Sequence, residues 1–332
     1  MLDLRVGRHW EAFQVSSVKL AKFVMKRFEY VPETPEVGVS HHARNEIFRH
    51  LIFREGSDAE RREIMLSLSQ GIYDDESRHH WEQYFGTDLK PFLEGKSVLD
   101  LGCFTGGRAV AWFERYRLTS ITGIDVDQVY VDAAEQFATV KGSPAQFELA
   151  RGEELPFGEE TFDAVLSFDV FEHVQDPAKT LLECRRVLKP GGRMFLVFPG
   201  YFQPLEHHLS LATRAPFIHY VFGGDTLVRA YHEILEARGD AAAWYKRSSP
   251  SLAPWERGNT INGLTLRTFR RLVKQSDLRV VLQSHQPLGG VGRRAVTDRR
   301  VRVVSRLLRP LAQLPLLEEA FLHRIAVVLE RP

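Results

Sequence analysis

Short apolar runs alternate with helical segments between residues 97 and 199, and this alternation restricts the fold more than any other feature of the chain. Short apolar runs bounded by turn residues are typical of strands in a parallel sheet, where both faces are buried. Parallel strands need long crossover connections, which are usually helices. The pattern therefore predicts a doubly wound α/β domain built from βαβ units.

The same pattern places the individual elements. Asp176 and Pro177 mark the start of one helix, because aspartate is a good N-cap and proline suits the first helical turn. Residues 189–192 are expected to end that helix. After residue 199 the alternation lapses, and it resumes near Leu264. The strands are expected at 97–101, 120–124, 146–149, 162–167, 194–198, 278–282 and 325–329, with a further helix at 268–275.

Residues 1–85 lack the alternation and read as helices. One helix is expected to begin with a capping box from Ser57 to Glu60 and to end at Gly71. We expect this region to be a helical cap or a dimerisation element, through which the chain forms a homodimer.

The rest of the chain, residues 86–332, is expected to form the α/β domain, with residues 199–263 as a substrate-binding insertion. Ligands of such folds bind at the carboxyl ends of the strands, where an insertion of this kind lies.

Composition narrows the class of protein. The chain has 332 residues, 44% hydrophobic and 26% charged, and a formal net charge of +1, so we expect no general nucleic-acid binder. Its two cysteines, Cys103 and Cys184, form neither a disulfide framework nor a zinc-binding spacing. No signal peptide and no apolar run long enough to span a bilayer is visible in the sequence. A soluble, cytoplasmic protein is therefore expected.

The strongest motif lies at residues 98–107, where an apolar strand reaches Asp100 and leads through Gly102 and Gly106 into a helix. Glycines allow a tight turn and a close approach of a ligand to the backbone. The helix start offers unpaired amides to a polar or anionic ligand. Nucleotide-binding proteins also use such a turn, so the motif alone leaves the ligand open.

Asp125 ends the next strand, in the position where a carboxylate accepts hydrogen bonds from a ribose diol. This position suits any cofactor that contains adenosine, so a nicotinamide cofactor and S-adenosylmethionine are both open at this point. The alternative role for Asp125 is a helix N-cap, for which Asp127 is the better candidate.

In combination, these motifs resemble class I S-adenosylmethionine-dependent methyltransferases, particularly their bacterial small-molecule branch. The resemblance covers roughly residues 97–199 and continues more weakly towards the C-terminus. It rests on matches in the right order at residues 100–106, 123–125, 152–157, 161–165, 171–177 and 186–192. The family resemblance implies a Rossmann-like doubly wound seven-stranded sheet, S-adenosylmethionine as cofactor, and a methyltransferase domain at residues 86–332.

The resemblance also implies roles for residues. Asp100 would act on the amine of the cofactor's methionine part, and Asp125 would hold its ribose hydroxyls. The other implied cofactor-binding residues surround the methionine part (Gly102, Cys103, Gly106, Phe168 and Asp169) or the adenine (Val126, Glu153, Glu154 and Leu155). Glu153 and Glu154 could equally be solvated loop charges, and Cys103 a small buried filler rather than a reactive thiol.

One residue departs from the family pattern. The middle glycine of the first loop is replaced by Phe104, which would narrow the cofactor pocket or shift its geometry.

Methyl transfer to a hydroxyl needs a group that removes the acceptor's proton, and histidine suits this because its pKa is near neutral. The insertion contains His207 and His208 after an aromatic pair, similar to methyltransferases that act on sugars and other natural-product hydroxyls. We expect His208 to be the base and His207 to be the second candidate, with a packed or surface histidine as the alternative. Adjacent histidines do not face one site, so we expect no metal.

These observations favour O-methylation of a small hydroxylated metabolite, such as a sugar or natural product. Methylation of RNA or a modified nucleoside is a second hypothesis, supported only by the arginine-rich stretch at residues 293–309. A solvated helix face is the alternative for that stretch. A third hypothesis, a non-catalytic cofactor-binding scaffold, is supported only by Phe104.

Overall fold

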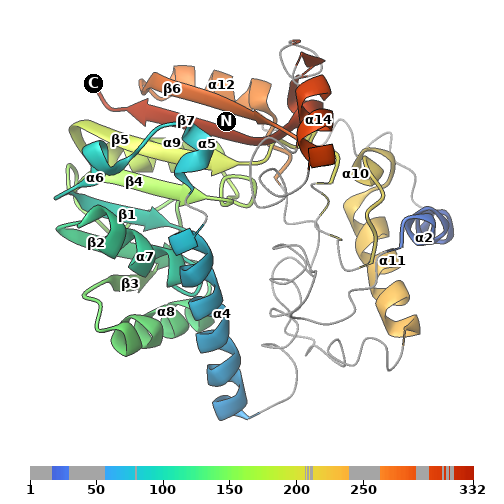
Figure 1. The fold of residues 1–332 in the computed structure, drawn as a ribbon, viewed down its shortest axis with the longest axis horizontal. Coiled ribbons are helices and arrows are strands. Elements are labelled where there is room, and N and C mark those ends of the chain that lie inside the picture. The colour runs from blue at the N-terminus through green and yellow to red at the C-terminus, as the bar shows by residue number, and fades with distance from the viewer. Residues whose placement is uncertain are drawn as a thin grey trace. The chain divides into compact units, whose positions relative to one another are not determined.

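The computed structural model (Figure 1) describes residues 17–29, 57–78, 81–205, 207, 209, 212–238, 262–288, 299–308, 310–311, 314 and 318–332. The chain divides into two compact units. One combines residues 66–201 with 264–332, and the other combines residues 1–65 with 202–263. The domain boundaries expected from the sequence stay predictions.

The larger unit, residues 66–201 with 264–332, folds around a seven-stranded sheet of order β3-β2-β1-β4-β5-β7-β6. The neighbouring strands from β3 to β5 are parallel, and β7 is antiparallel to both β5 and β6. The expected Rossmann-like doubly wound sheet is therefore confirmed. The strands are β1 (Ser97–Leu101), β2 (Ser120–Asp125), β3 (Gln146–Leu149), β4 (Phe162–Phe168), β5 (Leu188–Phe198), β6 (Arg279–Pro287) and β7 (Leu322–Glu330).

Helices pack on both faces of this sheet (Figure 1). They and the other helical elements of the unit are α4 (Asp58–Arg78), α5 (Glu82–Phe85), α6 (Lys90–Leu93), α7 (Gly107–Tyr116), α8 (Gln128–Lys141), α9 (Pro177–Val187), α12 (Leu266–Gln275), α14 (Arg299–Leu308) and η4 (Glu318–Phe321), α4 beginning in the smaller unit.

Alternate side chains of each central strand enter two separate cores, because successive residues of a strand point to opposite faces. Phe195 and Val197 of β5 pack in a core with side chains of α5, α7 and α8. Met194, Leu196 and Phe198 pack on the other face with side chains of α9 and α12. Burial on both faces explains why the strands are continuous apolar runs.

The order of the strands determines where a ligand can bind. The chain builds β1, winds outwards through β2 to β3, and returns to β4 on the other side of β1. The crossovers therefore diverge between β1 and β4, and this leaves a crevice for ligands at the carboxyl ends of the two strands. Asp100 and Asp125 end neighbouring strands at this edge.

Two local expectations are wrong. The capping box forms, with the Ser57 amide donating to Glu60 Oε2 at 2.8 Å, but α4 continues past Gly71 to Arg78. A glycine inside a helix costs only about 1 kcal/mol, and the burial of Ile72 and Glu76 beyond it favours continuation.

The second concerns the start of β5. The helix α9 ends at Val187, next to residues 189–192 as expected, but these residues already belong to β5, which was expected to begin at 194; their register opposite Phe162 and Ala164 is irregular. Gly191 has φ +73°, which suits a bulge within a strand.

The smaller unit has its own apolar core. Its described helices are α2 (Val18–Arg27), α10 (Ile218–Val221) and α11 (Gly224–Ala237). Ala21 and Met25 of α2 pack in the same cluster as Ala230 and Ile234 of α11. Across the described residues of the whole chain, no helix is long and apolar enough to cross a membrane.

The two-core architecture predicts unequal costs for two leucine substitutions. Leu196 is fully buried in the core beneath α9 and α12, whereas Leu182 on α9 is 52% exposed. Leu196→Ala should lower the free energy of unfolding by about 2–5 kcal/mol, because it removes buried methyl groups and leaves a cavity. Leu182→Ala should change it by less than about 0.5 kcal/mol. Urea unfolding followed by circular dichroism measures both, and equal effects would contradict the assignment of this core.

Candidate functional site

The glycine-rich turn after β1 is fixed to the neighbouring strand by its backbone. The amides of Gly102 and Cys103 both donate to the carbonyl of Ile124, at 2.9 and 2.8 Å. Gly102 has φ +78°, and a Cβ there would lie 2.3 Å from a methyl group of Val170. Only glycine therefore fits this position without displacing a neighbour.

The helix α7 begins directly after this turn. Its N-cap is Gly106, which has φ +74° and no side chain to cap the helix. The first amides of α7 are therefore not satisfied by an N-cap side chain, and such amides are suited to polar or anionic ligand groups.

Phe104 replaces the family's middle glycine with a left-handed backbone of its own, at φ +50°. Its amide donates to Asp125 Oδ2 at 2.9 Å, and its ring lies 4.4 Å from the ring of Tyr130 between centroids. A non-glycine residue in this conformation costs about 1–2 kcal/mol. The aromatic contact and the hydrogen bond hold the turn in shape. The expected narrowing of a cofactor pocket stays a prediction.

Asp125 accepts amide hydrogen bonds on both carboxylate oxygens, from Phe104 on Oδ2 and from Asp127 at 3.2 Å on Oδ1. Each carboxylate oxygen has about two acceptor sites, so both retain capacity for a ribose hydroxyl. Burial raises the pKa of Asp125 to about 6, against the opposing effect of these amides. Asp127, and not Asp125, occupies the N-cap position of α8, although its side chain makes no capping bond.

Asp100 is the most unusual carboxylate of the turn. It is 2% exposed, and its Oδ2 has no hydrogen-bond partner within the described part of the chain. Burial raises its pKa to about 7, and the charge of Arg108 opposes this rise. A buried polar atom without a partner is costly, so a cationic ligand group at Asp100 would be strongly favoured. The orphaned oxygen and the glycine turn therefore both fit S-adenosylmethionine.

Of the residues expected near the adenine, two are buried and make hydrogen bonds within the protein, and two are exposed. Glu153 is buried, and its Oε1 accepts from the amides of Gln175 at 2.6 Å and Asp176 at 3.2 Å. It therefore holds the loop before α9, a structural role that the sequence did not predict. Leu155 is buried and donates its amide to Glu183. Glu154 and Val126 are exposed at the surface of the unit.

Phe168 is the last residue of β4 and Asp169 follows it, but Asp169 is already paired. Arg324 at the start of β7 donates to it from Nε at 2.8 Å and from Nη2 at 3.3 Å. Asp169 has φ +56°, a conformation that this bidentate pair holds in place. The sequence did not point to Arg324, because the pair joins segments far apart in the chain.

Cys103 is buried, and burial raises the pKa of its thiol well above the ordinary value. A thiol of this kind is protonated at neutral pH and is a poor nucleophile. This supports the role of a small buried filler.

The proposed bases belong to the smaller unit or lie outside the described residues. His207 is buried, and its Nδ1 accepts from the amide of Leu209 at 3.1 Å. His208 is outside the described residues. Of the arginine-rich stretch, residues 299–308 form α14, and Arg306 is exposed there. Within the described part of the chain, no group of three or more histidine, cysteine, aspartate or glutamate side chains could hold a metal ion.

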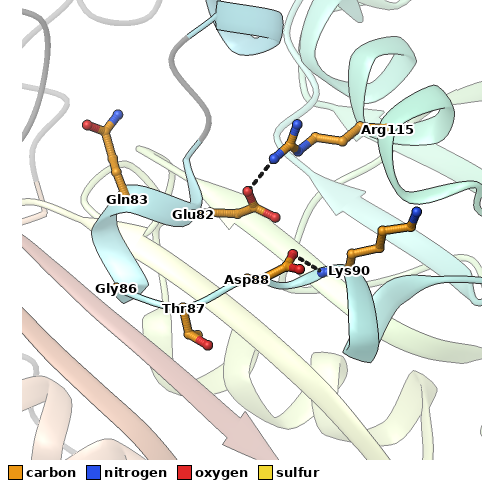
Figure 2. Close-up of a pocket in the computed structure, with 7 residues that line it drawn as sticks. All are labelled: Glu82, Gln83, Gly86, Thr87, Asp88, Lys90 and Arg115. Carbon is orange, nitrogen blue, oxygen red and sulfur yellow. Dashed lines mark hydrogen bonds and ion pairs between the residues drawn. The ribbon is translucent and has the colours of Figure 1, made fainter.

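A surface pocket lies elsewhere, between α5, α6 and the last turn of α7 (Figure 2). Its lining includes Arg115, which pairs with Glu82 at 2.6 Å, and Asp88, which accepts from the Lys90 amide at 2.9 Å. Arg115 lies roughly 12 Å along α7 from the glycine-rich turn, at 1.5 Å per residue. The pocket is therefore separate from the edge that carries Asp100 and Asp125.

Comparison with known proteins agrees with this geometry. The family described as "Methyltransferase domain" matches residues 99–196. A ubiquinone biosynthesis O-methyltransferase from Hahella chejuensis is 30% identical over 201 residues, covering 58% of this chain and 74% of that protein. The protein of the same name from Rhizobium rhizogenes is 35% identical over 121 residues, which span 36% of this chain and about half (48%) of that relative.

Solved structures are more distantly similar. An S-adenosylmethionine-dependent methyltransferase from Mesorhizobium loti is 15% identical with a TM-score of 0.47, covering 73% of this chain and 93% of that one. The family match and the long alignment with the Hahella chejuensis protein give the assignment. The chain belongs to the class I S-adenosylmethionine-dependent methyltransferases.

Proposed function

We propose that this protein transfers a methyl group from S-adenosylmethionine to a hydroxyl group of a small metabolite. The observation that carries the proposal is the pair of carboxylates beside the glycine-rich turn, the buried Asp100 and the half-buried Asp125, whose pKa values are both raised. In this proposal Asp100 binds an ammonium group and Asp125 binds a ribose diol. An adenosyl amino acid contains both groups, whereas a nicotinamide dinucleotide contains no amino-acid end.

The acceptor is the less constrained half of the proposal. The relatives named above are O-methyltransferases of ubiquinone biosynthesis, which supports a hydroxyl as the accepting group. The aromatic and histidine-rich insertion supports a hydroxylated sugar or natural product. A homodimer through the N-terminal helices stays part of the proposal, and Leu20 and Phe23 of α2 are 46% and 58% exposed.

When bound, S-adenosylmethionine supplies a methyl carbon that the acceptor oxygen attacks in line, forming a C–O bond as the C–S bond breaks. The chain must orient the two molecules and accept the proton of the hydroxyl. His207 Nδ1 accepts the Leu209 amide, so in the neutral ring the proton lies on Nε2. This leaves His207 without a free lone pair for a substrate proton and favours His208 as the base.

Asp125→Asn should weaken binding of S-adenosylhomocysteine by about 10–100-fold, because hydrogen bonds to a charged group contribute about 1.5–3 kcal/mol. Isothermal titration calorimetry measures this. The matched control is Asp132→Asn on α8, an exposed aspartate that pairs with Gln128 and should leave the affinity unchanged. Equal affinities for the parent and Asp125→Asn would contradict the ribose-binding role.

Affinity for S-adenosylhomocysteine should also fall as the pH is lowered. The pKa values of about 7 for Asp100 and about 6 for Asp125 mean that both carboxylates are ionised only above neutral pH. The ionised forms bind the ammonium and diol, so affinity should be highest near pH 8. It should be at least about tenfold lower at pH 5. Calorimetry across this range tests the sign, and a flat profile would refute it. In the Asp125→Asn variant, the part of the affinity loss that occurs around pH 6, where Asp125 becomes protonated, should be absent.

The acceptor class is tested by incubating the purified protein and methyl-labelled S-adenosylmethionine with a fractionated cell extract. The label should enter a small-molecule fraction as an alkali-stable methyl ether. Label in RNA would favour the second hypothesis, and cofactor binding without any transfer would favour a scaffold. With the small-molecule acceptor in hand, His208→Ala should reduce turnover by about 10²–10⁴-fold. His207→Ala should have the smaller effect, and full turnover of His208→Ala across pH would contradict the base assignment.

A further inference from the structure

Arg108, the second residue of α7, lies beside the glycine-rich turn, and the family motifs assign it no role. Its guanidinium carbon lies 4.1 Å from the centre of the Phe168 ring and 5.8 Å from that of Trp112. The side chain is 19% exposed. Aromatic faces attract a guanidinium in this position, so the two rings hold the charge in one place.

Arg108 has an ion-pair partner, but its buried Nε makes no hydrogen bond within the described part of the chain. Its nearest anion is Glu76, with 3.5 Å between Arg108 Nε and Glu76 Oε2, and Nε is buried without an acceptor. A guanidinium has five N–H donors in a planar fork, which matches a carboxylate bidentately. A fixed and largely dry fork of this kind is a binding group for an anionic oxygen pair.

Glu76 is itself immobilised. It is 6% exposed, and its Oε1 accepts from the Trp81 amide at 3.1 Å and from Trp112 Nε1 at 3.0 Å. Glu76 therefore balances the charge of Arg108 across 3.5 Å, without accepting a hydrogen bond from the guanidinium Nε. The close approach of α4 to the turn supports this arrangement, since a Cβ on Gly107 would lie 2.2 Å from the carbonyl oxygen of Ser69.

Opposite charges are therefore presented on the two sides of one turn. Asp100 precedes it with an orphaned carboxylate oxygen, and Arg108 follows it with a guanidinium that is ion-paired to Glu76 but whose Nε has no hydrogen-bond acceptor. We propose that Arg108 binds the α-carboxylate of the cofactor's methionine part, while Asp100 takes its α-ammonium group. This inference rests on the proposed function, and it makes Arg108 the residue that selects ligands with an intact amino-acid end.

Two ligands separate this role from a structural one. S-adenosylhomocysteine carries the amino-acid end, and 5′-methylthioadenosine has the same adenosine and thioether without it. Arg108→Met should weaken binding of S-adenosylhomocysteine by about 10–100-fold, because it removes charge-assisted hydrogen bonds. Binding of 5′-methylthioadenosine should change by less than about twofold. Arg108→Lys should recover part of the loss, because lysine restores the charge but not the fork. Titration calorimetry measures each affinity.

Arg117→Met is the matched control, since Arg117 lies at the other end of α7 and its side chain is 76% exposed. It should bind both ligands like the parent. The inference is overturned if Arg108→Met binds S-adenosylhomocysteine normally, or if it loses both ligands in equal proportion. A parent protein that binds neither ligand would refute the proposed function itself, an outcome distinct from any difference between variants.

Discussion

The carbonyl of Ile124 accepts two amides of the glycine-rich turn, and much of the candidate site depends on this one contact. It fixes the turn after β1 to the end of β2, and the Phe104 amide adds a third bond, to Asp125. The two carboxylates therefore reach the same edge of the sheet at a set separation. Without this contact the turn would be an ordinary loop, and neither Asp100 nor the start of α7 would be oriented towards a shared ligand.

Burial then determines the pKa values and the pairing of the charged groups at this edge of the sheet. Asp100 and Asp125 are desolvated enough to raise both pKa values, and Arg108 and Glu76 are placed around aromatic rings. Buried charges of this kind lower stability unless a partner compensates them. Within the protein, these charged groups only partly compensate one another. Such partial compensation is expected where a zwitterionic ligand supplies the remaining partners, an ammonium group for Asp100 and a carboxylate for Arg108.

The fold could be predicted from the sequence because its determinants are local. The apolar runs, the Asp176–Pro177 helix start and the Ser57 capping box act within a few residues, and each forms as expected. The positions of Asp100 and Asp125 follow from strand ends, so they too were predictable. Gly71 was misread as a helix end because a glycine permits a helix to stop without requiring it. Arg324 and Glu76 were missed because their partners, Asp169 and Arg108, are distant in sequence.

Phe104 shows that a sequence motif can lose a residue type and still keep the backbone conformation that the motif provides. Its absent glycine is the one departure from the family pattern, yet the turn keeps its left-handed residue and its bond to Asp125. What the turn needs at this position is a left-handed backbone and a backbone amide for Asp125. A residue other than glycine can provide both at a modest energetic cost. The side chain packs against Tyr130 on α8, and this aromatic contact offsets part of that cost. The substitution is therefore compatible with a working cofactor turn, and it gives no independent support to the scaffold hypothesis.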